Sequence, residues 1–116
     1  MNFQSSFAQT WPILGNEGLI SSVASSYTSI AVVNNGVDFT PYVAYTESAV
    51  PKVKKRLSDG TWAQVGANLG TNASYVQIYA DPTGNLYVAY IDVAAGSKLV
   101  IKKYDYIAGT WDALNP

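Results

Sequence analysis

Cysteine and histidine are both absent from this chain of 116 residues, and arginine occurs once, as Arg56. Without cysteine the chain has no disulfide, no thiolate metal site and no thiol nucleophile. Without histidine it lacks the usual general base near neutral pH, Ser-His-Asp chemistry and most zinc or iron sites. The sequence therefore predicts no catalytic residues, no metal site and no cofactor, with eight Asp and Glu side chains as the remaining candidates for acid–base work.

Charged residues are also scarce, at 13% of the chain with a formal net charge of −1. Binding to nucleic-acid phosphates requires a concentrated basic surface, so seven Lys and Arg residues predict no nucleic-acid partner. The one basic run, residues 52–56, is expected to be a strand with alternate side chains facing solvent. No segment is long and apolar enough to cross a membrane, and residues 1–4 lack the features of a signal peptide, so we expect no membrane partner and the localisation stays open.

The residues that the chain does contain favour β-structure. Nine tyrosines stand against three phenylalanines, and clusters of Gly, Asn, Asp, Ser and Pro separate short runs rich in Val, Tyr, Thr and Ile. We expect almost no helix and two sets of four strands, at 28–33, 40–46, 52–57 and 61–65, and at 74–80, 85–92, 98–104 and 110–114. In each second strand the tyrosines alternate with smaller residues, which predicts that they project from one face and pack on a neighbouring sheet.

The two sets of strands form an internal repeat. A Gly-Thr-Trp motif ends at Trp62 and again at Trp111, and a Thr-Trp pair ends at Trp11, which gives intervals of 51 and 49 residues. The sequence Tyr-Val-Ala-Tyr starts at Tyr42 and is repeated unchanged from Tyr87, and a Lys-Lys pair follows each copy. Because a period of about 50 residues made of short strands is typical of a β-propeller blade, the chain is expected to contain two blades.

These residues resemble the tandem-repeat β-propellers of bacterial proteins, whose blades have a second strand similar to Tyr-Val-Ala-Tyr and end in Asp-Gly-Thr-Trp followed by a Val-Gly step. Here that step is at 65–66, and the resemblance covers residues 10–114. It implies an all-β fold with two four-stranded antiparallel blades per chain, residues 15–66 and 67–116. Two blades are too few to close a ring, so it also implies closure by homo-oligomerisation, with a cyclic trimer favoured and a tetramer or pentamer as alternatives.

Residues 1–14 are predicted to hold a ninth strand, one more than two blades need. The segment around Trp11 is expected to be an outer strand that completes a blade of a neighbouring copy. There it would compete with residues 110–114 for one sheet edge. We favour the N-terminal strand in that place because it continues for longer, and Pro12 suits an edge strand.

A second resemblance concerns the architecture. Some small fucose-binding lectins consist of two blades per chain and trimerise into a six-bladed ring with sugar sites between the blades. A lectin-like, non-catalytic module suits this composition, because flat Tyr and Trp faces cover sugar C–H groups while carboxylates accept hydrogen bonds from hydroxyls. The candidate carbohydrate-binding residues are Tyr45, Glu47, Trp62, Tyr90, Asp92 and Trp111.

Two other functions remain open. One is a self-assembling structural or designed propeller with no ligand, in which the aromatic residues serve only packing. The other is a sialidase-like glycosidase, which needs several arginines to hold the substrate carboxylate. Arg56 is the one arginine, and its equivalent in the second blade is Tyr104. Glu47 and Asp92 fall at equivalent places of different blades rather than forming an opposed pair, so the sequence favours binding over catalysis.

Overall fold

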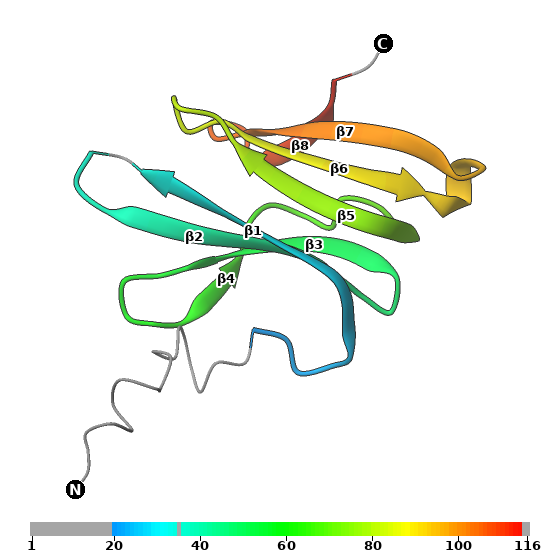
Figure 1. Ribbon diagram of the computed structural model, residues 1–116, viewed down its shortest axis with the longest axis horizontal. Coiled ribbons are helices and arrows are strands. Elements are labelled where there is room, and N and C mark those ends of the chain that lie inside the picture. The colour runs from blue at the N-terminus through cyan, green and yellow to red at the C-terminus, as the bar shows by residue number, and fades with distance from the viewer. Residues whose placement is uncertain (1–19, 35, 115–116) are drawn as a thin grey trace, which may run out of the picture.

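The chain folds into two four-stranded antiparallel sheets (Figure 1), shown by a computed structural model that describes residues 20–34 and 36–114. Sheet 1 contains β1 (Ser25–Asn34), β2 (Phe39–Glu47), β3 (Val50–Arg56) and β4 (Trp62–Gln64). Sheet 2 contains β5 (Ala73–Ala80), β6 (Leu86–Asp92), β7 (Lys98–Asp105) and β8 (Thr110–Ala113). In each sheet the strands follow one another in chain order. The all-β prediction is confirmed, because the described part of the chain has a single helical element, the 3-10 turn Val93–Ala95.

The turns carry the residues that tight turns favour. Between β5 and β6 the Asp81 carboxylate accepts hydrogen bonds from the Thr83 hydroxyl at 2.8 Å, the Thr83 N–H at 3.0 Å and the Asn85 N–H at 2.9 Å. These donors, the Thr83 hydroxyl foremost, lower the pKa of Asp81 to about 2. Gly84 follows at φ 91°, a left-handed conformation that glycine adopts without strain. The local sequence therefore fixes this hairpin.

The two sheets have the same register. Ile30 pairs with Val43 in sheet 1 as Ile78 pairs with Val88 in sheet 2. The pairings of β3 with its neighbours are reproduced by those of β7, and a bulge interrupts β1 and β5 at the same place. Each strand residue of sheet 1 thus has a defined equivalent in sheet 2.

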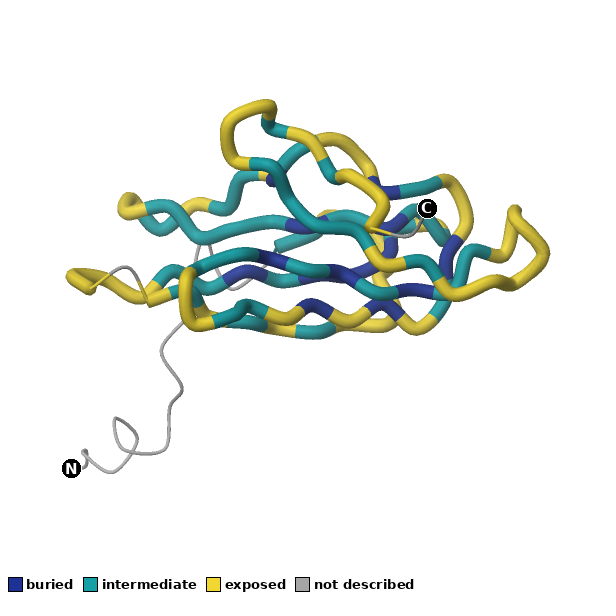
Figure 2. The backbone as a smooth tube through the Cα atoms, turned by 90° about the horizontal axis from the view of Figure 1, so that it is seen from above, coloured by how far each residue is buried: buried dark blue, intermediate teal, exposed yellow. Residues whose placement is uncertain are grey.

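The hydrophobic core lies between the sheets, which pack face to face with β5 against β1 and β2. Figure 2 shows buried positions alternating with more exposed ones along the strands, as the two-residue period of a strand requires. The buried core consists of Tyr42, Ala44, Val53, Val65, Leu69, Ala73, Val76, Ile78, Leu86, Val88 and Tyr90. Each sheet therefore contributes one of its two faces to this core.

The prediction that the tyrosines of each second strand share one face is wrong. Tyr42 lies in the core between the sheets, whereas Tyr45 is buried on the opposite face of sheet 1. In sheet 2 the faces are exchanged, with Tyr90 in the core and Tyr87 on the outer face. The tyrosines of each motif are three residues apart, and an odd spacing along a strand places side chains on opposite faces.

The ninth strand predicted around Trp11 lies outside the described residues. In sheet 2 the edge position beside β7 is occupied by β8 of the same chain, with Trp111 opposite Tyr104 and Asp112 opposite Lys103. A neighbour's N-terminal strand at that edge stays a prediction. Across residues 20–34 and 36–114, no helix combines the length and hydropathy that crossing a membrane needs.

Candidate functional site

The contact between the sheets defines two kinds of sheet face. The downstream face holds Tyr42, Ala44 and Val53 in sheet 1, and their equivalents Tyr87, Ala89 and Ile101 in sheet 2. The upstream face holds Ile78, Val88 and Tyr90 in sheet 2, and their equivalents Ile30, Val43 and Tyr45 in sheet 1. Within the chain, the downstream face of sheet 1 packs on the upstream face of sheet 2, and this contact is called the joint. Among residues 20–34 and 36–114, no second sheet packs on the other two faces, which are called the free faces.

Trp111 fastens one end of the joint. Its indole N–H donates a hydrogen bond to the Val65 carbonyl at 2.8 Å, and its ring lies 5.0 Å from that of Tyr104 between centroids. Gly66, at φ 70°, lies directly against both rings, since an added Cβ would be 2.9 Å from the indole Cδ1 and 3.1 Å from Tyr104 Cε1. The tryptophan thus packs sheet 2 onto the segment that leaves sheet 1.

Polar contacts to the segment between the sheets fasten the other end. The Tyr90 hydroxyl and the Lys102 ammonium both donate to the Leu69 carbonyl, at 2.9 and 2.6 Å. Lys54, the equivalent of Lys102, donates in the same way to the Ile20 carbonyl at 2.7 Å. The segment before β1 and the segment before β5 are therefore both held by a lysine that donates a hydrogen bond to a backbone carbonyl.

Apart from Tyr45, which is as buried as its equivalent Tyr90, the free faces expose apolar side chains at positions that are buried in the joint. Ile30 is 60% exposed on the free upstream face, whereas its equivalent Ile78 is 7% exposed. Ile101 is 39% exposed on the free downstream face, whereas its equivalent Val53 is fully buried. Soluble monomers rarely leave contiguous apolar patches of this kind uncovered. The most exposed apolar residues of the free downstream face are Tyr79, Leu99 and Leu114.

An open cavity of about 230 Å³ lies where the bulges of β1 and β5 meet. It is lined by Tyr27, Thr28, Ser29, Tyr75, Val76 and Gln77. The Tyr27 and Tyr75 rings are both exposed, and their centroids are 5.0 Å apart. Both tyrosines have left-handed backbones, with φ 53° and 54°, which costs a bulky residue about 1–3 kcal/mol. Strain kept at equivalent places of both sheets marks this cavity as a candidate ligand site.

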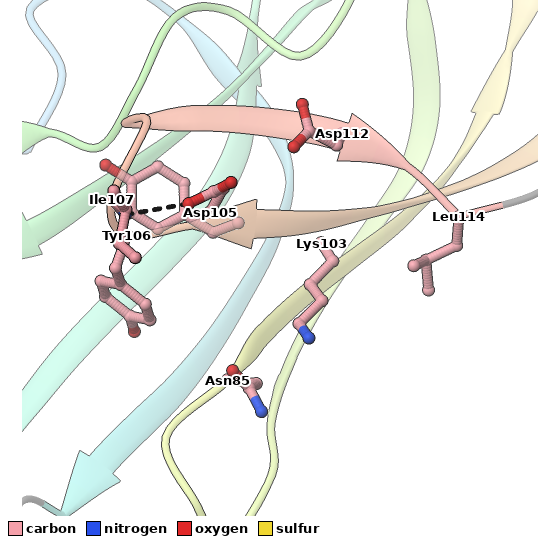
Figure 3. A pocket seen from close by; sticks show the side chains of 8 residues that line it. Asn85, Lys103, Asp105, Tyr106, Ile107, Asp112 and Leu114 are labelled. Atoms are coloured by element: carbon pink, nitrogen blue, oxygen red, sulfur yellow. Dashed lines mark hydrogen bonds between the residues drawn. The ribbon is translucent and has the colours of Figure 1, made fainter.

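A second cavity, of about 420 Å³, opens on the free downstream face of sheet 2 beside β7 and β8 (Figure 3). Its lining includes the polar side chains of Asn85, Lys103, Asp105 and Asp112. The N–H groups of the following turn donate to Asp105, that of Ala108 foremost, and lower the pKa of its carboxyl. Asp112 accepts a hydrogen bond from the Thr110 hydroxyl at 3.1 Å. The lining of the cavity thus contains two carboxylates and one ammonium group.

Among the predicted carbohydrate-binding residues of sheet 1, Glu47 is already engaged within the chain. Its carboxylate accepts hydrogen bonds from the Lys52 ammonium at 2.6 Å and from the Ser21 hydroxyl, and both lower its pKa. Burial, followed by the nearby Glu47 charge, raises the pKa of Tyr45 to about 12. At neutral pH Glu47 is therefore ionised and Tyr45 is neutral. Trp62 is half-buried near the opposite end of β3.

The predicted residues of sheet 2 lie apart from these. Tyr90 and Trp111 are part of the joint, where the observed role of both side chains is packing and hydrogen bonding within the chain. Asp92 lies beyond the joint and accepts a hydrogen bond from the Ala95 N–H at 3.3 Å, which caps the 3-10 turn. The structure therefore does not bring the six predicted residues together in one site.

The sequence prediction missed the residues that line the two cavities. Tyr27 and Tyr75 are visible as equivalent positions of the repeat, but only the bulges expose both rings at one place. Lys103 belongs to the Lys-Lys pair and Asp112 follows the Gly-Thr-Trp motif, so they belong to different strands. They become neighbours because β7 pairs with β8 in this register. The register of the paired strands identifies these residues, and the sequence pattern alone does not give that register.

The groups that line the two cavities suit binding by stacking and by hydrogen bonding. No three His, Cys, Asp or Glu side chains among them lie close enough together to hold a metal ion. Aromatic faces, carboxylates, hydroxyls and amides suit a polyhydroxylated ligand or another protein surface. In comparisons of the chain with known proteins, no family model, no curated protein and no solved structure matches it.

Proposed function

We propose that the chain is a non-catalytic β-propeller subunit that binds copies of itself head to tail. In each contact, called the seam, the free downstream face of sheet 2 packs on the free upstream face of sheet 1 in the next copy. The observation that carries this proposal is the exposure of Ile30 and Ile101 at positions whose equivalents, Ile78 and Val53, are buried in the joint. The joint is thus a template for the seam.

A polar contact supports the same arrangement. Across the joint, the Ile78 N–H donates a hydrogen bond to the Ser29 hydroxyl at 3.1 Å. At the seam the equivalent residues are Ile30 of one copy and Gln77 of the other, and the Gln77 side chain supplies a carbonyl as acceptor. Head-to-tail contacts close into a ring or continue as a filament. Three copies, which give six blades, are the favoured closure, and four or five copies are the alternatives.

The mass in solution tests the seam. Native mass spectrometry and sedimentation at micromolar concentration are expected to give three times the 12.5 kDa chain mass. Ile30→Asp and Ile101→Asp each place a charge in an apolar contact and are expected to weaken association by roughly 100-fold or more. Thr71→Asp, on an exposed connecting segment, is the control and should associate like the wild type. A wild-type chain that stays monomeric at tens of micromolar contradicts the proposal.

Carbohydrate binding at the cavity between the bulges is the second candidate function. The exposed Tyr27 and Tyr75 rings, together with the Gln77 amide and the hydroxyls of Thr28 and Ser29, combine apolar faces with hydrogen-bonding groups. This is the combination that sugar recognition uses. A ring repeats the cavity in every subunit, so individually weak sites would act together on a multivalent glycan.

A glycan array followed by calorimetry tests this site. Tyr27→Ala and Tyr75→Ala each remove an aromatic face and are expected to weaken binding roughly 3- to 10-fold without changing the oligomeric mass. Val93→Ala removes an exposed apolar side chain of the 3-10 turn that lines neither cavity and serves as the control. If an assembled wild type binds no sugar, or both tyrosine variants bind normally, the chain acts as a self-assembling propeller without this ligand site.

A further inference from the structure

The cavity beside β7 and β8 lies on the face that the next copy covers at the seam, so its occupant is inferred here on the basis of the proposed assembly. The joint shows which residue takes the equivalent place within the chain. Tyr104 pairs with Trp111, and its ring packs on Gly66 at the edge of sheet 1. Arg56 pairs with Trp62 in the same register. The residue of the next copy that occupies the place of Tyr104 is therefore Arg56.

The downstream face, which receives this residue, also differs between sheet 1 and sheet 2. In sheet 1, the row across the three outer strands of the downstream face is Tyr42, Lys55 and Ala63. In sheet 2, the same row is Tyr87, Lys103 and Asp112. In the joint the Tyr104 ring packs on Gly66, which directly follows Val65. The equivalent of Val65 in sheet 2 is Leu114, and Leu114 lines the cavity together with Asp112. The seam therefore brings a guanidinium, in the place of the Tyr104 phenol, to a cavity that holds a carboxylate where sheet 1 has the Ala63 methyl group.

One N–H donor of the Arg56 guanidinium is unused within the described chain. Its Nε is buried and has no hydrogen-bond partner among the described residues. A guanidinium carries five N–H donors in one plane and suits a carboxylate better than any other side chain does. The cavity has an excess of negative charge, since Asp105 and Asp112 stand against Lys103 alone. The Lys103 ammonium lies 5.9 Å from the centre of the Tyr87 ring.

We propose that Arg56 of one copy enters this cavity in the next copy and forms an ion pair with Asp112. This ion pair requires β8, which carries Asp112, to be the fourth strand of sheet 2, as it is in the structure. Partial burial at the seam strengthens such a charge pair, and a charge pair at one point fixes register and orientation more than it adds affinity. Arg56 and Asp112 would thus orient the head-to-tail contact, while the apolar residues of the free faces supply most of the affinity.

Charge reversal tests the pair. Arg56→Asp and Asp112→Arg each bring like charges together and are expected to weaken self-association roughly 10- to 100-fold in sedimentation, with a steeper loss at low salt. The double variant restores opposite charges and is expected to associate within about threefold of the wild type. Lys98→Asp, a reversal on an exposed residue outside the cavity, should leave association unchanged.

The outcomes separate this inference from the assembly itself. If the single variants associate like the wild type, or the double variant is no better than either, the pair is wrong while the seam stands. If the wild type does not associate, the proposed function fails and the pair fails with it. Should a reversal unfold the chain, as circular dichroism would reveal, Arg56→Gln and Asp112→Asn take its place. Each should weaken association and flatten its salt dependence, and an unchanged salt dependence counts against the pair.

Discussion

Replacement of Gly66 by alanine is expected to destabilise the folded chain by about 2–4 kcal/mol. Gly66 has φ 70°, and an added Cβ would lie 2.9 Å from Trp111 Cδ1, 3.0 Å from Trp111 Nε1 and 3.1 Å from Tyr104 Cε1. Real Cβ atoms do not approach ring atoms this closely, so the indole must move. Its movement breaks the hydrogen bond from the Trp111 N–H to the Val65 carbonyl. Denaturant unfolding of the dilute protein measures the loss.

Gly96→Ala is the matched control for this substitution. Gly96 has φ 84°, and an added Cβ there would meet no atom within 4 Å. The control therefore keeps the backbone strain, worth about 1–2 kcal/mol, and omits the collision. The difference between the two variants reports the packing of Trp111 and Tyr104 on Gly66. Equal losses would mean that this contact does not constrain the joint.

The elements of the fold were predictable because their signals are local. Strand residues alternate over short runs, and turns such as Asp81 to Asn85 have side chains that bond their own backbone. The repeated Tyr-Val-Ala-Tyr motif also indicated that the two sets of strands are built alike, and the common register confirms it. What the motif could not indicate is which of its two tyrosines enters the core.

The faces and the cavities depend on contacts that are distant in sequence. Tyr42 and Tyr90 both lie in the joint although they occupy the first and last positions of the same motif, because the joint uses opposite faces of the two sheets. The bulges that expose Tyr27 and Tyr75 insert residues out of the strand period, and periodicity alone does not show them. The repeated motif was the basis for predicting a carbohydrate site around Tyr45, whereas the exposed pair of aromatic rings in the structure is Tyr27 and Tyr75.

Ile78→Ala and Ile30→Ala are expected to differ strongly in dilute protein, although the two isoleucines are equivalent. Ile78 is buried in the joint, so its truncation leaves a cavity and is expected to cost about 2–5 kcal/mol of unfolding free energy. Ile30 is exposed on the free upstream face, so its truncation is expected to cost less than about 1 kcal/mol. Denaturant unfolding at a concentration where sedimentation shows a monomer measures both values.

Raising the protein concentration should remove part of this difference, because the seam buries Ile30 as the joint buries Ile78. Ile30→Ala is then expected to weaken self-association about tenfold or more, at roughly 25 cal/mol per Å² of apolar surface that the seam no longer covers. Ile78→Ala should lower stability at every concentration, since the joint exists in each single chain. If Ile30→Ala cost as much as Ile78→Ala in the monomer, the upstream face would already be covered within the chain. Ile78→Ala gives the cost of truncating this isoleucine in a contact that the structure shows. Comparing the cost of Ile30→Ala in the assembled protein with that value therefore measures how closely the seam copies the joint.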